Sequence, residues 1–137
     1  MAEFILKSVV KAKGLQDQYI INSAATSREE IGNDIYPPAK KCLNGHGIPF
    51  DAHSARQITK ADLEYYDYII AMEECNIKNL RRMIGDSGKY SLLLDYTNTP
   101  GDISDPWYSG NFEIVYKEIE MGCRGFLSRT KSILNEP

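Results

Sequence analysis

The chain has 137 residues, of which 42% are hydrophobic and 26% charged, with a formal net charge of −3 and a pI near 5.4. This composition fits one globular domain over residues 1–137 and provides no basic footprint for nucleic acid or anionic membranes. The three cysteines are odd in number and lack C-x-x-C spacing, and no apolar run reaches the roughly 18 residues of a membrane span. We therefore expect a cytoplasmic protein with reduced thiols that binds neither nucleic acid nor membrane.

The first predicted element is a helix that begins at the first residue and ends near Gly14. It combines a broad apolar face with a polar stripe: Phe4, Ile5, Leu6, Val9 and Val10 against Glu3, Lys7 and Lys11. No Ser, Thr, Asp or Asn precedes this helix to cap its first N–H groups. We therefore expect that a segment is missing in front of it.

The remaining elements alternate between short apolar runs and amphipathic stretches. The runs predict strands at Tyr19–Asn22, Asp67–Met72 and Tyr90–Leu94. The stretches predict helices from Pro37 to the 45–47 region, from Thr59 to Tyr65 or Tyr66, over Glu74–Ile84, and after Asn111. The resulting order predicts an α/β fold, a doubly wound parallel sheet with helices on both faces. It is one strand short, because such a domain normally enters through a strand that leads directly into the first helix.

Local signals support two of these helices. Thr59, with Asp62 three residues later, is a variant of the capping box, and Asn111 is a suitable cap for the last helix. The last helix carries one long apolar stripe: Phe112, Val115, Tyr116, Ile119, Cys123, Phe126, Leu127 and Ile133 or Leu134.

Cys75 and Arg81 have the C-x5-R spacing of cysteine-dependent phosphatases. In such a site the intervening backbone curls around the phosphate, but residues 76–80 contain no glycine and continue a helical apolar period. The sequence therefore predicts a cysteine and an arginine on a helix rather than a catalytic loop. Cys42 and Cys123 fall on apolar helix faces, which predicts core packing.

The segment Asp105-Pro106-Trp107-Tyr108 places a carboxylate at a proline turn beside two aromatic rings. A carboxylic acid on a loop before a helix suits proton delivery to a leaving group, and flanking rings suit the wall of a site for a flat substrate. The residues alone favour the simpler interpretation, an aspartate that only starts a turn.

Most of the chain, in the right order, resembles the low-molecular-weight protein tyrosine phosphatases. The resemblance is carried by MAEFILKSVV, INSAATS, EEIGN, HGIPFDAHSARQITKADLEYYDYIIAMEECN, LLLDY and DPWYSGNFEIVYKEIEMGCRGFL. In that family the segment similar to MAEF follows a strand and a phosphate loop of pattern C-x5-R-S-P. The resemblance thus implies a truncated domain whose missing piece holds the nucleophilic cysteine and the phosphate-binding arginine, so that the chain as written is inactive.

The resemblance also implies roles for individual residues. Asp105 matches the acid that protonates the departing phenol oxygen of phosphotyrosine after a cysteine thiolate attacks phosphorus. Trp107 and Tyr108 match the aromatic wall of the substrate site. Ser23 and His53 match residues that hold the shape of the phosphate loop, although a serine at a strand end and a surface histidine need no such role.

Two further positions bear on the site. His46 resembles another histidine near the active site of the family, but between two glycines it also fits a helix terminator. Glu29 stands where many members carry a bulky aromatic residue on the opposite wall of the substrate site, so we expect it to disfavour acidic phosphopeptides.

The resemblance implies hydrolysis of phosphotyrosine-containing proteins or small aryl phosphates, with no cofactor and no metal. It leaves open whether phosphoarginine is the substrate instead. The alternative function is a noncatalytic, phosphatase-like binding module. Thiol-dependent arsenate reductases share the fold, but they need redox cysteines close together in sequence, which this chain lacks. Without the first strand, unpaired sheet edges predict self-association.

Overall fold

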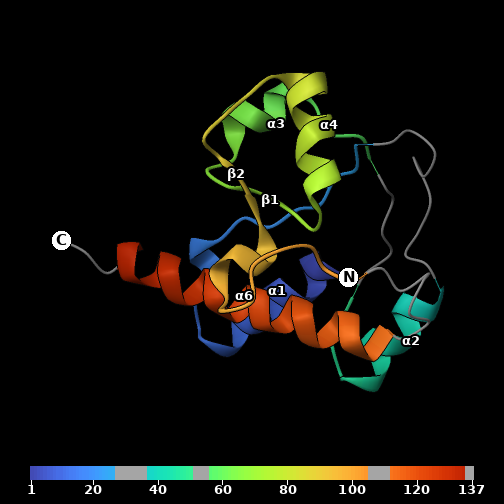
Figure 1. Cartoon of the computed structure of the whole chain (residues 1–137). Coiled ribbons are helices and arrows are strands. Elements are labelled where there is room, and N and C mark those ends of the chain that lie inside the picture. Colours follow the sequence, from blue (N-terminus) through green and yellow to red (C-terminus); the bar gives the residue numbers. More distant parts are fainter. Residues whose placement is uncertain (27–36, 51–55, 105–111, 135–137) are drawn as a thin grey trace.

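The computed structural model describes residues 1–26, 37–50, 56–104 and 112–134. Helices lie on both sides of a short central sheet (Figure 1). The elements, in chain order, are α1 (Ala2–Ala12), η1 (Gln16–Gln18), α2 (Pro37–Gly45), α3 (Lys60–Tyr65), β1 (Ile69–Ala71), α4 (Glu74–Ile84), β2 (Tyr90–Leu92), η2 (Leu93–Tyr96) and α6 (Phe112–Leu134). The α/β class with a parallel sheet is confirmed.

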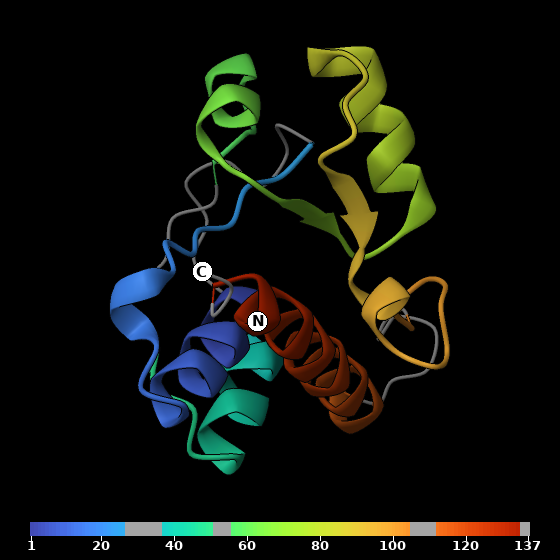
Figure 2. The same ribbon diagram turned by 90° about the vertical axis from the view of Figure 1, so that its left-hand side faces the viewer.

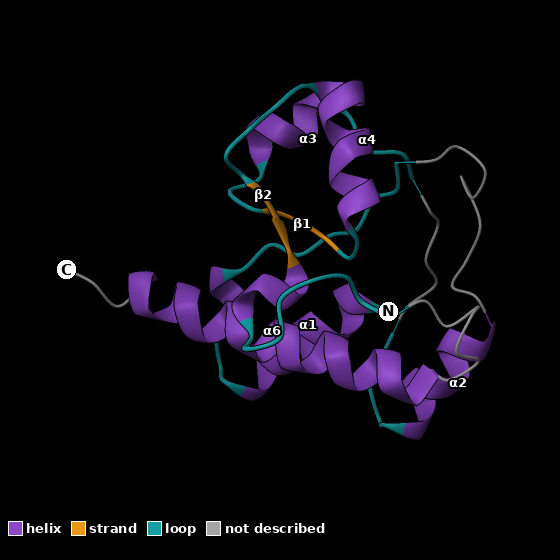
Figure 3. Ribbon diagram, viewed as in Figure 1, coloured by secondary structure: helices purple, strands orange, loops and turns teal. Residues whose placement is uncertain are grey.

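The two strands β1 and β2 are parallel and joined by α4 (Figure 3). Their register pairs Ile69 with Tyr90 and Ala71 with Leu92. Side chains alternate along a strand, so Ile69 and Ala71 pack with α4 residues while Ile70 packs into the core on the opposite face. This alternation places a buried layer on each face of the sheet, which explains why all three residues of β1 are apolar.

The larger core lies between α1, α2, η2 and α6, on the face of the sheet opposite α3 and α4 (Figure 2). Five residues of the predicted apolar stripe of α6 are buried in this core: Val115, Tyr116, Ile119, Cys123 and Leu127. All three cysteines are free thiols, as predicted, and Cys42 and Cys123 are buried. Among the described residues, no helix is long and apolar enough to cross a bilayer.

Helix α1 has the predicted form. Met1 occupies the N-cap position without a side-chain cap hydrogen bond, and Glu3 pairs with Lys7 one turn later at 2.8 Å. After the helix, Gly14 adopts a φ of 69°. This left-handed conformation allows the N–H of Leu15 to donate to the carbonyl of Val10, which ends the helix.

The prediction of a strand at Tyr19–Asn22 is wrong. Tyr19 has extended dihedral angles, but these residues join no ladder, and Ile20 is 68% exposed. Three residues after this stretch, Ala25 forms an isolated parallel bridge with Gln57. An extended stretch becomes a strand only when a neighbouring backbone supplies hydrogen-bond partners, and β1 does not reach it.

The predicted strand at Tyr90–Leu94 is too long. It ends at Leu92, and the chain turns into η2 because the Asp95 carboxylate accepts a hydrogen bond from the Leu92 N–H at 3.1 Å. Leu93 and Leu94 are buried as expected, but they pack into the core from a helical turn.

The start of α3 depends on Asp62, and its substitution provides a pH-sensitive test. Asp62 accepts the Thr59 N–H at 2.7 Å, as the capping prediction requires, and pairs with Arg56 at 2.9 Å. The hydrogen bond from Arg56 lowers the pKa of Asp62, so its stabilisation is present above the unfolded-state pKa and is lost as the pH falls through the folded-state pKa. Since Arg56 is partly exposed, we expect Asp62→Asn to cost about 0.5–1 kcal/mol near neutral pH.

Urea unfolding at neutral and acidic pH measures this effect. The loss caused by Asp62→Asn should shrink at acidic pH, where the wild-type carboxyl is itself protonated. Asp86→Asn is the matched control, because the Arg81–Asp86 pair has side chains that are 54% and 80% exposed and should contribute little. An equal loss at both pH values would contradict the ionic role of Asp62.

Candidate functional site

A large groove separates β1 from the extended residues 19–26. Its volume is about 1330 Å³, and its lining includes Met1, Ser23, Ile70 and Met72. The start of α1 therefore faces the same space as the carboxyl end of β1. In open α/β sheets, ligands bind outside the carboxyl ends of strands and near helix N-termini, so this is the candidate site.

Ser23 lies beside the first turn of α1. Its hydroxyl donates a hydrogen bond to the Glu3 carboxylate at 2.7 Å, and Lys7 contacts the other carboxylate oxygen of Glu3 at 2.8 Å. A polar cluster thus sits at the mouth of the groove, where the resemblance places the residues that support a phosphate loop.

The Cys75–Arg81 pair is not a phosphate site. Both residues lie on α4, where six residues span roughly 9 Å along the axis. The Cys75 thiol donates to Glu73 at 3.4 Å, and this hydrogen bond raises the thiol pKa, whereas a nucleophilic thiolate requires a lowered one. Arg81 is paired with Asp86. The prediction that this pair lies on a helix is confirmed.

Cys123 also has an arginine six residues later, Arg129, so the C-x5-R spacing occurs twice in the chain. Both residues lie within α6. Cys123 is 1% exposed, and burial raises its pKa to about 12. The Arg129 guanidinium lies over the ring of Tyr96, 4.7 Å from its centroid. Neither pair can hold a phosphate in a backbone loop. The C-x5-R spacing therefore does not indicate a phosphate site unless the intervening residues form such a loop.

Five predicted site residues lie outside the described residues: Glu29, His53, Asp105, Trp107 and Tyr108. The chain just before Asp105 is described, however, and it is anchored at the carboxyl end of β1. The N–H of Ile103 donates to the carbonyl of Met72 at 2.9 Å, and Asp102 accepts the N–H of Glu74 at 2.8 Å. Asp102 thereby caps α4 from a distant part of the chain, a role that no local sequence signal revealed.

His46 follows the last residue of α2. Its ring contacts Glu113 of α6 at 2.6 Å and stacks on Tyr116 with a centroid distance of 3.7 Å. His46 therefore does more than follow the end of α2, because its side chain joins this end to α6.

Comparison with known proteins identifies the family. The profile described as "Low molecular weight phosphotyrosine protein phosphatase" matches residues 1–136. The low molecular weight protein-tyrosine-phosphatase YfkJ of Bacillus subtilis is 39% identical over 132 residues, which is 93% of this chain and 85% of that protein. The chain belongs to the low molecular weight phosphotyrosine protein phosphatase family.

Further similarities support the same family assignment. The human low molecular weight phosphotyrosine protein phosphatase is 36% identical over 136 residues, covering 94% of this chain and 85% of that protein. The crystal structure of the Bacillus subtilis phosphatase superimposes with a TM-score of 0.90 at 37% identity, covering 96% of this chain and 85% of that one. A Drosophila arginine phosphatase superimposes with a TM-score of 0.83 at 28% identity, covering 95% and 88%.

Proposed function

We propose that this chain forms the body of a protein tyrosine phosphatase that hydrolyses phosphotyrosine through a phosphocysteine intermediate. In this proposal the nucleophilic cysteine and the phosphate-binding arginine belong to a C-x5-R-S-P segment that is not among the 137 residues. One observation carries the proposal. The family match spans residues 1–136, yet both C-x5-R pairs of the chain lie inside helices.

The position of the groove supports the proposal that the nucleophile belongs to a separate segment. A strand that entered between β1 and residues 19–26 would deliver its following loop to the start of α1, where the first N–H groups of the helix favour an anion. Ser23 already lies there, in position to bond to such a loop. Asp102 and Ile103, which precede Asp105 in the sequence, are anchored at the carboxyl end of β1.

The proposed chemistry has two steps. The loop thiolate attacks phosphorus while Asp105 protonates the phenol oxygen, and the same carboxylate then assists water in releasing phosphate from the cysteine. Trp107 and Tyr108 would form the wall beside the substrate ring, with Ser23 and His53 supporting the loop. The mechanism needs no metal and no cofactor.

The substrate class includes phosphotyrosine proteins and small aryl phosphates, and phosphoarginine should be assayed beside them. The similarity to a Drosophila arginine phosphatase motivates that assay. In the phosphotyrosine case, Glu29 should disfavour acidic phosphopeptides through charge repulsion. The cytoplasm suits this activity, because its reducing conditions preserve thiols.

The 137-residue chain by itself should not hydrolyse para-nitrophenyl phosphate. A positioned acid without a nucleophile cannot form the covalent intermediate, and the thiol pKa values of Cys75 and Cys123 are raised. Release of nitrophenolate by the purified chain measures this prediction. Activity that disappears in Cys75→Ser or Cys123→Ser would overturn the exclusion of these thiols.

If the chain extended by the C-x5-R-S-P segment were also inactive, the noncatalytic binding module would be supported instead.

A further inference from the structure

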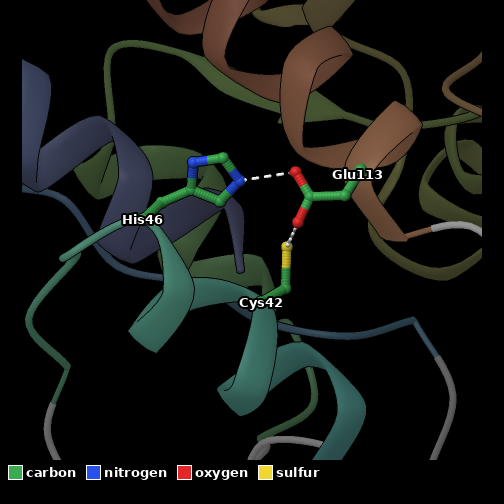
Figure 4. A group of neighbouring side chains, drawn as sticks. All are labelled: Cys42, His46 and Glu113. Carbon is green, nitrogen blue, oxygen red and sulfur yellow. Dashed lines mark hydrogen bonds and ion pairs between the residues drawn. The ribbon is translucent and has the colours of Figure 1, made fainter.

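Three side chains with different donor atoms meet between α2 and α6 (Figure 4). They are the thiol of Cys42, the imidazole of His46 and the carboxylate of Glu113. Cys42 Sγ lies 3.7 Å from Glu113 Oε1, and His46 Nε2 lies 2.6 Å from Glu113 Oε2. One donor atom from each residue falls within 4.8 Å of the other two. Cys42 lies in α2, His46 directly follows α2, and Glu113 lies in α6, so the cluster depends on how α2 and α6 pack.

Two of the three donor residues are close together in the sequence. Cys42 and His46 are four residues apart, at the end of α2 and just after it, so they project from the same side, as two metal-binding histidines do on a helix. The His46 ring is held by Tyr116, which stacks on it with an interplanar angle of 6°. Tyr116 is held in turn by its hydrogen bond to Glu120 at 2.9 Å. A ring oriented by its surroundings is the usual condition of a metal-ligating histidine.

We propose that Cys42, His46 and Glu113 bind one Zn²⁺ ion, with a fourth coordination position open to solvent. A thiolate, an imidazole and a carboxylate are the three ligand types that zinc takes in proteins. The thiolate and the carboxylate would neutralise the two positive charges of the ion. Harder cations such as Mg²⁺ or Ca²⁺ prefer oxygen ligands only, so the sulfur and nitrogen donors select zinc over them.

Zinc binding needs a rearrangement of the Glu113 carboxylate. With zinc–ligand bonds of about 2.0–2.3 Å, tetrahedral donor atoms stand roughly 3.3–3.6 Å apart. The two printed separations involve different carboxylate oxygens, since Cys42 Sγ lies 3.7 Å from Glu113 Oε1 and His46 Nε2 lies 2.6 Å from Glu113 Oε2. The carboxylate must therefore turn to present one oxygen to both donors, and the imidazole–carboxylate contact must open. The Glu113 side chain is 57% exposed and that of His46 is 31% exposed, which leaves room for this opening and a route for the ion.

Binding replaces a proton with the ion. Burial raises the pKa of Cys42, and the neighbouring Glu113 carboxylate raises it further, so the metal-free thiol is protonated. On binding, the S–H bond breaks, a sulfur–zinc bond forms and the thiol proton leaves to solvent, with no change of oxidation state. The ring proton that His46 Nε2 directs at Glu113 moves to Nδ1, so that the Nε2 lone pair can bind the ion. The bound ion would cross-link α2 to the first turn of α6. The site does not depend on the proposed phosphatase chemistry.

Cobalt(II) is a suitable probe because it occupies zinc sites and reports its ligands by absorption. The full 137-residue chain, freed of metal with a chelator, should bind one Co²⁺ and show a sulfur-to-cobalt charge-transfer band together with intense tetrahedral d–d bands. Added Zn²⁺ should abolish these bands by displacement. Cys42→Ser should remove the charge-transfer band, whereas His46→Gln and Glu113→Gln should weaken binding more than about 10–100-fold, the cost of losing an outer-shell partner.

Cys75→Ser is the matched control, because Cys75 is also a thiol beside a carboxylate but has no described histidine ligand. It should leave the spectrum unchanged. His46→Gln and Glu113→Gln replace partly exposed side chains, so they test the site even where Cys42→Ser disturbs the core. Three results would overturn the proposal: no thiolate band with Co²⁺, a band that survives Cys42→Ser, or affinity unchanged by both His46→Gln and Glu113→Gln.

Discussion

In the chain extended at its N-terminus by a strand and a C-x5-R-S-P loop, Asp105→Asn is expected to slow hydrolysis of phosphotyrosine by about 10²–10⁴-fold, the usual contribution of a positioned general acid. Phenolate from tyrosine is a basic leaving group that needs a proton as its bond to phosphorus breaks. An activated aryl phosphate releases a weakly basic phenolate, so the same substitution should slow it much less. Steady-state kcat on the two substrates measures this difference.

The control for this experiment is Asp102→Asn. Asp102 is a nearby carboxylate that accepts the N–H of Glu74, so its loss should weaken the cap of α4 while leaving the chemical step intact. The alkaline limb of the pH–kcat profile, where a general acid loses its proton, should disappear only in the Asp105 variant. Equal slowing of both substrates by Asp105→Asn would contradict the acid assignment. Absence of any activity in the extended chain would contradict the proposed function itself.

Gly125→Ala is expected to destabilise the protein by about 2 kcal/mol or more, which lowers Tm by roughly 8 °C. Gly125 lies within α6, where alanine is intrinsically better than glycine by about 1 kcal/mol. A Cβ atom at this position, however, would lie 2.0 Å from the carbonyl oxygen of Tyr96. That oxygen belongs to the backbone of η2, so relief requires the two elements to separate, and the clash outweighs the gain in helix propensity.

Thermal melting and urea unfolding measure this prediction, with Gly45→Ala as the control. Gly45 ends α2, and a Cβ there would meet nothing within 4 Å. The control should be neutral or slightly stabilising, because it restricts the unfolded chain without a clash. A Gly125→Ala protein as stable as the wild type would show that α6 and η2 do not approach each other this closely.

The elements that the sequence predicted well depend on contacts within one or two helical turns. Helix α4 follows its apolar period to Ile84 and ends at Gly85, and α3 begins where Thr59 and Asp62 can cap it. Val115, Ile119 and Cys123 of the α6 stripe are buried as the helical spacing requires. These patterns determine an element because residues three and four apart are neighbours in any helix, whatever the rest of the chain does. They also excluded Cys75 as a nucleophile, since a helix commits the N–H groups that a phosphate loop must present.

The tertiary structure decided what depends on residues far apart in the chain. The residues Tyr19–Asn22 are extended but form no strand, because a strand needs hydrogen bonds from a neighbouring backbone and the groove separates them from β1. The close approach of Gly125 to Tyr96 and the cap that Asp102 places on α4 have no local pattern. Cys42 and Glu113 are separated by 71 positions, so only the packing of α2 against α6 brings their thiol and carboxylate together.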